Sequence, residues 1–213
     1  MAEFKIQGDP VIAVGMRHYM RNKFPFVGAK TPERKLQTRP LIKASRQWTE
    51  AEVLARVAAI YARPEREYQY AAIDLARAHV REYNRADLLQ LRPLFLDRPW
   101  WDSVDALRPL YGDYVRLHPA ELTDVFDMFA HQDSFWLRRV GITLQLHSKA
   151  QTDTQLLQQA IEADLTTDEF FIQKAIGWAL RQYSKTNPDW VRAFFDSHDG
   201  MSTLAIREGS KYI

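Results

Sequence analysis

The stretch DEFFIQKAIGWALRQYS, residues 168–184, decides the fold class of this chain. At about 100° per residue, its apolar residues fall on one face of a helix and its basic residues on the opposite face. The apolar face holds Ile172, Ile176, Ala179, Leu180 and Tyr183, and the other face holds Lys174, Trp178, Arg181 and Lys185. A Trp among cations is typical of a nucleic-acid surface, and equally of an indole packed under a neighbouring helix. The pattern predicts an amphipathic helix and leaves the role of Trp178 open.

The same spacing of apolar residues recurs along the whole chain. It predicts helices over residues 10–23, 32–45, 49–62, 65–81, 86–97, 102–116, 119–131, 134–149, 153–165, 167–184, 188–197 and 202–211. Their starts carry clear signals. Thr49 and Glu52 form a capping-box pattern, and Pro32 and Pro188 stand at first helical positions. Since no stretch alternates as a strand does, the sequence predicts an all-α protein.

The helices follow one another through short loops, without a Gly/Ser linker that would divide two domains. We therefore expect a single domain over residues 1–213. Many amphipathic helices in succession indicate a stacked array, and HEAT units would repeat every 40 residues or so. That period is not visible when the chain is compared with itself, so an irregular helical bundle is the structural alternative.

Charge and composition exclude several classes of function. The chain has no Cys, which rules out disulfides, Cys-based zinc sites and a thiol nucleophile. The N-terminus does not have the pattern of a signal peptide, and no apolar run approaches a membrane span. Motifs for metals, nucleotide cofactors and serine triads are missing as well. We expect a cytoplasmic protein that uses neither metal nor cofactor and does not contact membranes.

The basic residues are unevenly distributed. Lys and Arg outnumber Asp and Glu by ten to three in residues 1–46, are outnumbered ten to fifteen in residues 47–133, and balance at nine each in residues 134–213. A cationic N-terminal stretch could meet phosphates or could simply be a solvated face. The stretch RHYMRNKFPF, residues 17–26, contains Tyr19 and could lie against DNA as a basic helix end, but an ordinary amphipathic helix is favoured from the pattern alone.

Two short motifs hold candidate site residues. In PWWDSVD, residues 99–105, Asp102 could be a helix N-cap with Asp105 as its reciprocal partner, and this capping interpretation is favoured from the pattern alone. The alternative is a carboxylate at Asp105 beside the aromatic wall of Trp101, facing a developing cation. In FWLRR, residues 135–139, Arg139 lies beside apolar positions and needs an anionic partner, either a carboxylate or a phosphate.

Several segments together resemble the AlkD-like DNA alkylation repair family. They are residues 17–24, 31–34, 68–74, 100–107, 135–139, 169–188 and 206–211, of which EFFIQKAIGWALRQYSKTNP, residues 169–188, is the most specific. The resemblance spans nearly the whole chain in the right order. One departure is a short segment before Arg17, about the length of a clipped first helix.

The resemblance implies HEAT-like repeats curved into a right-handed α-α superhelix with a basic concave cleft for duplex DNA. It also implies excision of N3- and N7-alkylated purines from alkylated double-stranded DNA, without flipping the base into a deep pocket. The family's catalytic carboxylate matches Asp105, and its site tryptophans match Trp101 and Trp178. Its DNA-contacting Arg and N-terminal Tyr match Arg139 and Tyr19.

A mechanism follows from this resemblance. An alkylated purine is already cationic and leaves as a neutral base, so stabilisation of the sugar cation by Asp105 suffices. Lys174, Arg181 and Lys185 are weaker candidates for phosphate contacts, and a monomer suffices for an open cleft. Two other functions remain as alternatives: a non-catalytic HEAT-repeat protein that binds distorted or branched DNA, and a protein-interaction scaffold.

Overall fold

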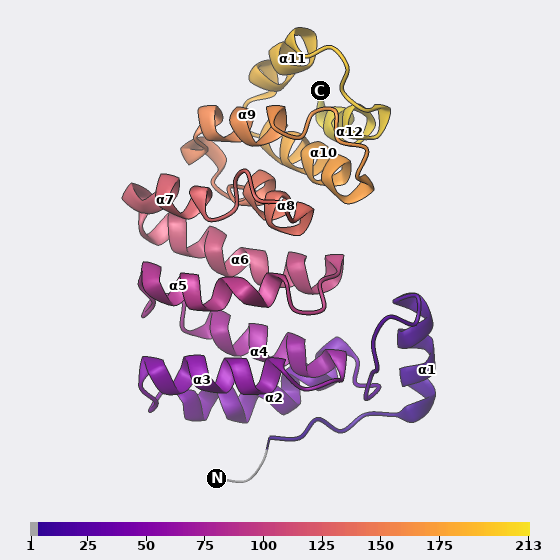
Figure 1. The fold of residues 1–213 in the computed structure, drawn as a ribbon, viewed down its shortest axis with the longest axis vertical. Helices are drawn as coiled ribbons and strands as arrows, with labels where there is room; N and C mark the ends of the chain where they lie inside the picture. The colour runs from indigo at the N-terminus through magenta and orange to yellow at the C-terminus, as the bar shows by residue number, and fades with distance from the viewer. Residues whose placement is uncertain (1–3) are drawn as a thin grey trace. The chain divides into compact units, whose positions relative to one another are not determined.

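A computed structural model describes residues 4–213, and these residues form twelve α-helices and no strand (Figure 1). Residues 1–3 lie outside the described residues. They belong to the N-terminal stretch for which the sequence predicts no signal peptide. The α-helices are α1 (Pro10–Tyr19), α2 (Thr31–Ser45), α3 (Glu50–Tyr61), α4 (Arg66–Ala78), α5 (Arg85–Leu91), α6 (Trp101–Leu117), α7 (Leu122–Asp127), α8 (Phe135–Thr143), α9 (Thr154–Glu162), α10 (Phe170–Ser184), α11 (Pro188–Ser197) and α12 (Thr203–Gly209). Short 3₁₀ helices are η1 (Arg92–Phe95), η2 (Pro119–Glu121), η3 (Lys149–Gln151) and η4 (Ser210–Tyr212). The all-α prediction is confirmed.

The chain divides into two compact units, one ending at Leu94 and one beginning at Phe95. The expected single domain, the HEAT-like superhelix and its basic concave cleft all concern the arrangement of the whole chain, and they stay predictions.

In the first unit, α4 is the central helix, and α2 and α3 pack against it. Its core face is formed by small and aliphatic side chains such as Ala71, Ala72 and Leu75, all without exposed surface. The capping box predicted at Thr49 is present: its backbone N–H donates to the Glu52 carboxylate at 2.7 Å. This start fixes α3 at the position that the sequence predicted.

The loop before α2 is fixed by a buried carboxylate. Glu67 in α4 has no exposed surface and accepts backbone N–H bonds from Val27 at 3.0 Å, Gly28 at 2.8 Å and Ala29 at 3.1 Å. Gly28 has a φ of +97°, and a Cβ there would lie 1.9 Å from the carbonyl oxygen of Asp9. Because only Gly fits this close approach, the loop holds the start of α1 against the unit.

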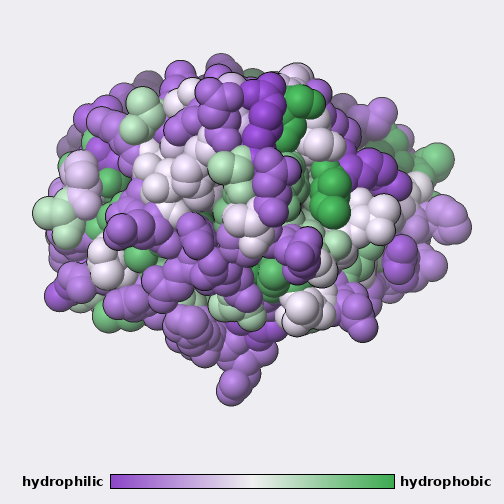
Figure 2. Space-filling model, turned by 90° about the horizontal axis from the view of Figure 1, so that it is seen from above, coloured by the Kyte–Doolittle hydropathy of each residue, from purple (hydrophilic) through white to green (hydrophobic). Residues whose placement is uncertain are grey.

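In the second unit, α10 is central and packs against α8, α11 and α12, while α6 packs on α8. The face predicted for residues 168–184 is the one it buries: Ile172, Ile176, Ala179 and Leu180 are all at most 4% exposed. The second unit therefore has its own core. In the view onto α11 and α12, the surface is mainly hydrophilic, with small groups of hydrophobic residues between the hydrophilic ones (Figure 2).

Several predicted helices end earlier than expected. The predicted helix 119–131 is η2 followed by α7, which ends at Asp127 before a turn with His131 at a φ of 55°. The predicted helix 134–149 ends at Thr143. Beyond it, the Gln145 amide exchanges hydrogen bonds with the backbone of Asp153 at 2.7 and 3.0 Å. This longer-range pairing replaces the last helical turn.

Candidate active site

The carboxylate of Asp105 lies near the start of α6. The helix begins at Trp101, and the N-cap residue Trp100 makes no side-chain capping hydrogen bond. The interpretation of Asp102 as the N-cap, with Asp105 as its reciprocal partner, is therefore wrong. Trp101 and Asp105 are four residues apart, so their side chains share one face of the helix. The Asp105 carboxylate takes its partner from another helix.

That partner is Arg139 of α8. Its Nε donates to Asp105 Oδ1 at 2.9 Å, and its Nη2 donates to Oδ2 at 2.7 Å. Its Nη1 donates to the carbonyl oxygen of Phe171, in the first turn of α10, at 2.5 Å. The Arg139 side chain is 6% exposed, whereas that of Asp105 is 23% exposed. The guanidinium thus joins three helices and presents a fixed carboxylate at a partly open position.

The sequence left a carboxylate and a phosphate open as partners of Arg139, and the carboxylate partner is present. A guanidinium has five N–H donors, and the bonds to Asp105 and Phe171 occupy three of them. Two donors remain for a further acceptor. The DNA contact expected for Arg139 stays a prediction.

Trp178 lies beside this ion pair. It is half-buried in α10, with the guanidinium carbon of Arg139 at 5.9 Å from its ring centroid and that of Arg108 at 5.5 Å. Because Arg139 lies against both Trp178 and Asp105, the indole and the carboxylate share one neighbourhood. These distances are within the range of a cation–π interaction.

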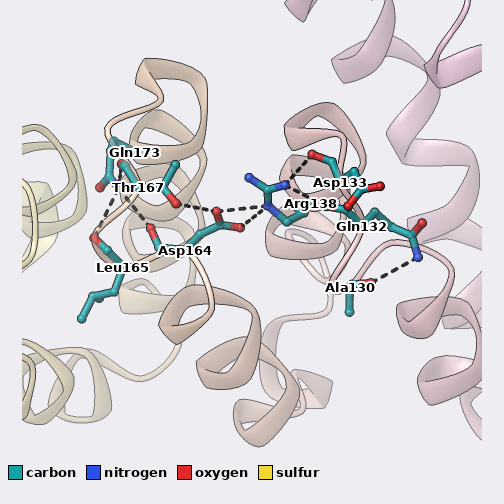
Figure 3. A network of polar contacts seen from close by, with 8 residues as sticks. All are labelled: Ala130, Gln132, Asp133, Arg138, Asp164, Leu165, Thr167 and Gln173. Carbon is teal, nitrogen blue, oxygen red and sulfur yellow. Dashed lines mark hydrogen bonds and ion pairs between the residues drawn. The ribbon is translucent and has the colours of Figure 1, made fainter.

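Arg138, next to Arg139, has other partners, which include Asp164 (Figure 3). Its Nε donates to both carboxylate oxygens of the buried Asp164, at 3.1 and 3.0 Å, and its Nη1 donates to two backbone carbonyls in residues 132–133. Gln173 of α10 donates from its amide to the carbonyl oxygen of Asp164 at 3.2 Å. This network ties α8 to the start of α10, which positions Arg139.

An aromatic cluster lies at the same end of α6, α8 and α10. The ring of Trp100 is 5.2 Å from that of Phe171 and 6.0 Å from that of Trp136, and the rings of Trp136 and Phe171 are 4.9 Å apart. Sequence reasoning assigned no role to Phe171, whose carbonyl binds Arg139. Its position in an apolar run gave no signal of this interaction, because a backbone acceptor leaves no trace in the sequence.

Two of the three basic residues predicted on one face of α10, Lys174 and Arg181, have a common partner that the sequence did not indicate. Glu208 of α12 pairs with Arg181 at 2.9 Å and with Lys174 at 3.8 Å, and it also pairs with Lys211 at 2.9 Å. The hydrogen bond from Lys211, with the charges of Lys174 and Arg181, lowers the pKa of Glu208. Lys185 is outside this group.

The ammonium of Lys185 lies 4.8 Å from the ring centroid of Tyr212 and donates to the side chain of Gln182 at 3.0 Å. Tyr19 belongs to the first unit, as the last residue of α1, and it is 71% exposed. The DNA contacts expected for Lys185 and Tyr19 stay predictions.

In the part of the chain that the structure describes, no group of three or more His, Asp or Glu side chains is arranged to hold a metal ion. Within the same residues, every helix is too short or too polar to cross a membrane.

The fold and this geometry define an all-α protein with a carboxylate, a guanidinium and an indole grouped at one site. The family model described as DNA alkylation repair enzyme matches residues 1–213. The chain therefore belongs to the DNA alkylation repair enzyme family, and this membership implies that DNA is its substrate.

Solved structures are similar to it along nearly its whole length. A predicted DNA alkylation repair enzyme from Enterococcus faecalis is 44% identical, with a TM-score of 0.97 and 99% of both chains covered. AlkD2 from Streptococcus mutans is 14% identical, with a TM-score of 0.69 over 94% of this chain and 99% of its own. The smu.31 protein from Streptococcus mutans UA159 is 15% identical, with a TM-score of 0.67 over 93% of this chain and 99% of its own. At such low identity, the last two show the fold alone. No curated protein sequence matches the chain.

Proposed function

We propose that this protein is a DNA glycosylase that hydrolyses the N-glycosidic bond of cationic N3- and N7-alkylated purines in duplex DNA, the first step of base excision repair. The single observation that carries the proposal is the Asp105 carboxylate, held by two hydrogen bonds from Arg139 beside the Trp178 ring. The family supports an activity on alkylated DNA. The choice of reaction rests on the chemistry of this site.

The charge of the lesion determines what the enzyme must supply. A purine alkylated at N3 or N7 carries a positive charge and becomes neutral when its bond to the sugar breaks. A general acid is therefore unnecessary, and the remaining barrier comes from the cationic sugar and the attacking water. One carboxylate performs the electrostatic half of the work that two carboxylates share in glycoside hydrolases.

Asp105 is proposed to face the sugar cation and to orient the water. At a separation of about 4 Å and an effective dielectric of about 20, opposite charges attract by about 4 kcal/mol, or about a thousandfold in rate. Arg139 offsets part of this attraction, so the figure is an upper bound. In exchange, the two bonds hold the carboxylate in one orientation before substrate arrives, which lowers the reorganisation needed in the transition state.

The two indoles are proposed to form the walls around the reacting sugar. Trp178 lies beside the ion pair, and Trp101 lies one helical turn before Asp105. Each ring face would attract the cationic lesion or sugar by about 0.5–2 kcal/mol. Such walls also exclude bulk water, which strengthens the electrostatic effect of Asp105.

DNA binding is proposed to involve the cationic residues near the site and the N-terminal helix. Arg139 keeps two N–H donors for a phosphate while it holds Asp105. The other proposed contacts are Tyr19, Lys174, Arg181 and Lys185. Neither a metal nor a cofactor enters the proposal, and a monomer acting on chromosomal DNA in the cytoplasm would suffice.

The test uses Asp105→Asn on a duplex that contains 7-methylguanine. Release of free base and formation of abasic sites are measured, and binding to an uncleavable duplex is measured in parallel. We expect excision to fall by more than about a hundredfold, with affinity changed by less than about threefold. Asp113→Asn is the matched control, because Asp113 lies in the same helix and pairs with Arg116. It should excise as the unmodified protein does.

Unchanged excision by a folded Asp105→Asn protein would remove the carboxylate from the mechanism. The same assay separates the two rival functions. A non-catalytic binder of distorted or branched DNA would bind the duplex and release no base. A protein-interaction scaffold would bind neither intact nor alkylated DNA at moderate salt.

A further inference from the structure

Phe170 is a large apolar side chain that is open to solvent beside the candidate active site. It is the first residue of α10 and is 53% exposed. Its ring packs edge-on against the ring of Phe171 at 5.3 Å, and the ring of Phe171 packs against that of Trp136 at 4.9 Å. Phe170 is therefore the outer member of the aromatic cluster, supported on one side and exposed on the other.

The start of α10 is held in a defined position. The Glu169 carboxylate accepts the backbone N–H of Phe171 at 3.1 Å and caps the helix. The carbonyl oxygen of Phe171 accepts a hydrogen bond from Arg139, which also holds the Asp105 carboxylate. Phe170 thus precedes, by one residue, the backbone group that binds this guanidinium. A side chain fixed in this way loses little freedom when a ligand packs against it.

Phe170 extends the face of α10 that carries Trp178. Phe170, Lys174 and Trp178 follow one another at intervals of four residues, so their side chains lie along one side of the helix. The Lys174 side chain is 43% exposed, and its ammonium lies 3.8 Å from the Glu208 carboxylate, near the outer limit of an ion pair. The face presents an aromatic ring, a cation and a second aromatic ring in succession.

This succession matches the chemistry of one DNA strand, in which deoxyribose rings alternate with anionic phosphates. Aromatic rings interleaved with cations are a common surface for such a strand. A helix rises about 1.5 Å per residue, so Phe170 and Trp178 are about 12 Å apart along α10. Nucleotides are about 3.4 Å apart along the duplex axis and farther apart along the strand itself, so this distance spans about two to four nucleotides.

We propose that Phe170 is a further DNA-binding residue of this site, whose ring packs against the deoxyribose of a nucleotide about two to four positions from the lesion. The inference rests on the proposed function, because it takes Trp178 to lie at the damaged nucleotide. In this arrangement, Lys174 contacts a phosphate between the two rings. A phenyl ring has no hydrogen-bonding group, so the contact adds affinity without reading the base sequence.

The surroundings of Phe170 favour DNA over a protein partner. A protein interface needs a contiguous apolar area with few charges at its centre. On this face of α10, the side chain one turn after Phe170 is the cation Lys174, which suits a phosphate and interrupts an apolar area.

The test measures binding to a duplex that the protein cannot cleave, so it does not depend on excision. The duplex carries 7-methylguanine on a 2′-fluorinated sugar, whose glycosidic bond resists hydrolysis. Phe170→Ala should weaken binding by about fivefold, because burial of a few tens of Å² of a ring changes affinity by about that factor. Leu117→Ala is the matched control and should bind as the unmodified protein does. Leu117 is 40% exposed and ends α6, about 18 Å along the helix from Asp105.

A scan of the DNA locates the contact. One nucleotide at a time, on either strand, is replaced by a three-carbon linker that keeps the phosphates and lacks both the sugar ring and the base. At one position, about two to four nucleotides from the lesion, the linker should weaken the unmodified protein by about fivefold and leave Phe170→Ala unaffected. A tetrahydrofuran nucleotide at that position keeps the sugar ring without the base, and it should restore the binding of the unmodified protein.

The proposal is overturned if Phe170→Ala binds as tightly as the unmodified protein, or if the linker weakens both proteins equally at every position. It is also overturned if the tetrahydrofuran nucleotide fails to restore binding, since the ring would then contact a base, or if the coupled position is the lesion itself. Thermal melting verifies that each variant is folded. If Phe170→Ala is destabilised, Phe170→Leu replaces it and should show the same coupled position with a smaller loss.

Excision of 7-methylguanine from an ordinary duplex is assayed separately. A protein that shows the coupling at Phe170 and releases no base supports the DNA contact and refutes the glycosylase proposal. Excision without the coupling overturns only the role of Phe170.

Discussion

The buried carboxylate of Glu67 gives the sharpest test of what holds the first unit together. It accepts three backbone N–H bonds from residues 27–29, two at Oε1 and one at Oε2. In Glu67→Gln, one oxygen becomes an NH₂ group. If the amide oxygen stays with Gly28 and Ala29, the NH₂ faces the N–H of Val27, donor against donor. The charge that strengthens the other two bonds is lost as well.

The size of the effect follows from the bond types. Bonds to a charged group contribute about 1.5–3 kcal/mol each, and neutral ones about 0.5–1.5. Replacing three charged bonds by two neutral ones should therefore lower the free energy of unfolding by about 3 kcal/mol, after allowance for the cost of burying the carboxylate. For a chain of this length, the melting temperature should fall by about 6–12 °C.

The assay is urea and thermal unfolding, with hydrogen exchange at the amides of Val27, Gly28 and Ala29. Glu65→Gln is the matched control, because Glu65 lies two residues earlier, makes no side-chain cap and has a buried Oε2 without a hydrogen-bond partner in residues 4–213. That variant should be neutral or slightly stabilising. A loss below about 1 kcal/mol in Glu67→Gln, or an equal loss in Glu65→Gln, would refute the reasoning.

Three other predictions concern the second unit. Gly177→Ala places a Cβ 2.5 Å from that of Glu208 and 3.0 Å from the carbonyl oxygen of Ala205, so urea unfolding should show a loss of about 1–3 kcal/mol, and a gain would contradict this close approach. The pKa of Glu208 is lowered in the folded state, chiefly by the bond from Lys211, so its stabilisation is present above the unfolded pKa of about 4.5 and is lost as pH falls through the folded pKa. Glu208→Gln should therefore be less stable at neutral pH and lose less stability on acidification, as followed by unfolding at several pH values; an acid profile like that of the unmodified protein would argue against the ion pairs. Arg139→Ala should weaken DNA binding and reduce the slope of log affinity against log salt by about 0.9 if Arg139 contacts one phosphate, and an unaltered slope would count against that interaction.

Much of the fold could be predicted from the sequence because amphipathic helices leave a local signal. Each predicted helix contains or overlaps an observed one, and the buried face of α10 is the predicted face. The errors lie at helix ends such as Thr143, where the bonds between Gln145 and Asp153 decide the boundary. The division of the chain into two units near Leu94 had no linker to reveal it.

The candidate site residues were predicted from the sequence, mainly through the family resemblance, but the pairing of Arg139 with Asp105 was not. Arg139 could equally have met a phosphate, because its bond to Asp105 depends on the packing of α6 against α8. Lys174 and Arg181 were expected on a face open to DNA, and Glu208, about thirty residues later, pairs with both. Such partners come from other helices, and the periodicity of one helix contains no information about them.

The cationic and titratable side chains around Arg139 and Arg108 lead to a last prediction, on the range of bases removed. Arg139, bound to Asp105, and Arg108, beside Trp178, are poor acids because a guanidinium keeps its proton. His147, whose pKa responds to the charge of Arg108, is a weak candidate as well, since loss of hydration and then the charges of Arg108 and Arg116 lower its pKa and disfavour its protonated form. A neutral purine needs a proton to leave, whereas an alkylated, cationic purine does not.

The protein should therefore excise 7-methylguanine and leave hypoxanthine in an otherwise identical duplex, with no acid-promoted limb in the rate for 7-methylguanine between about pH 6 and 8. Comparable excision of hypoxanthine would require a general acid at this site. Selectivity would then come from recognition of the base and not from the charge of the lesion.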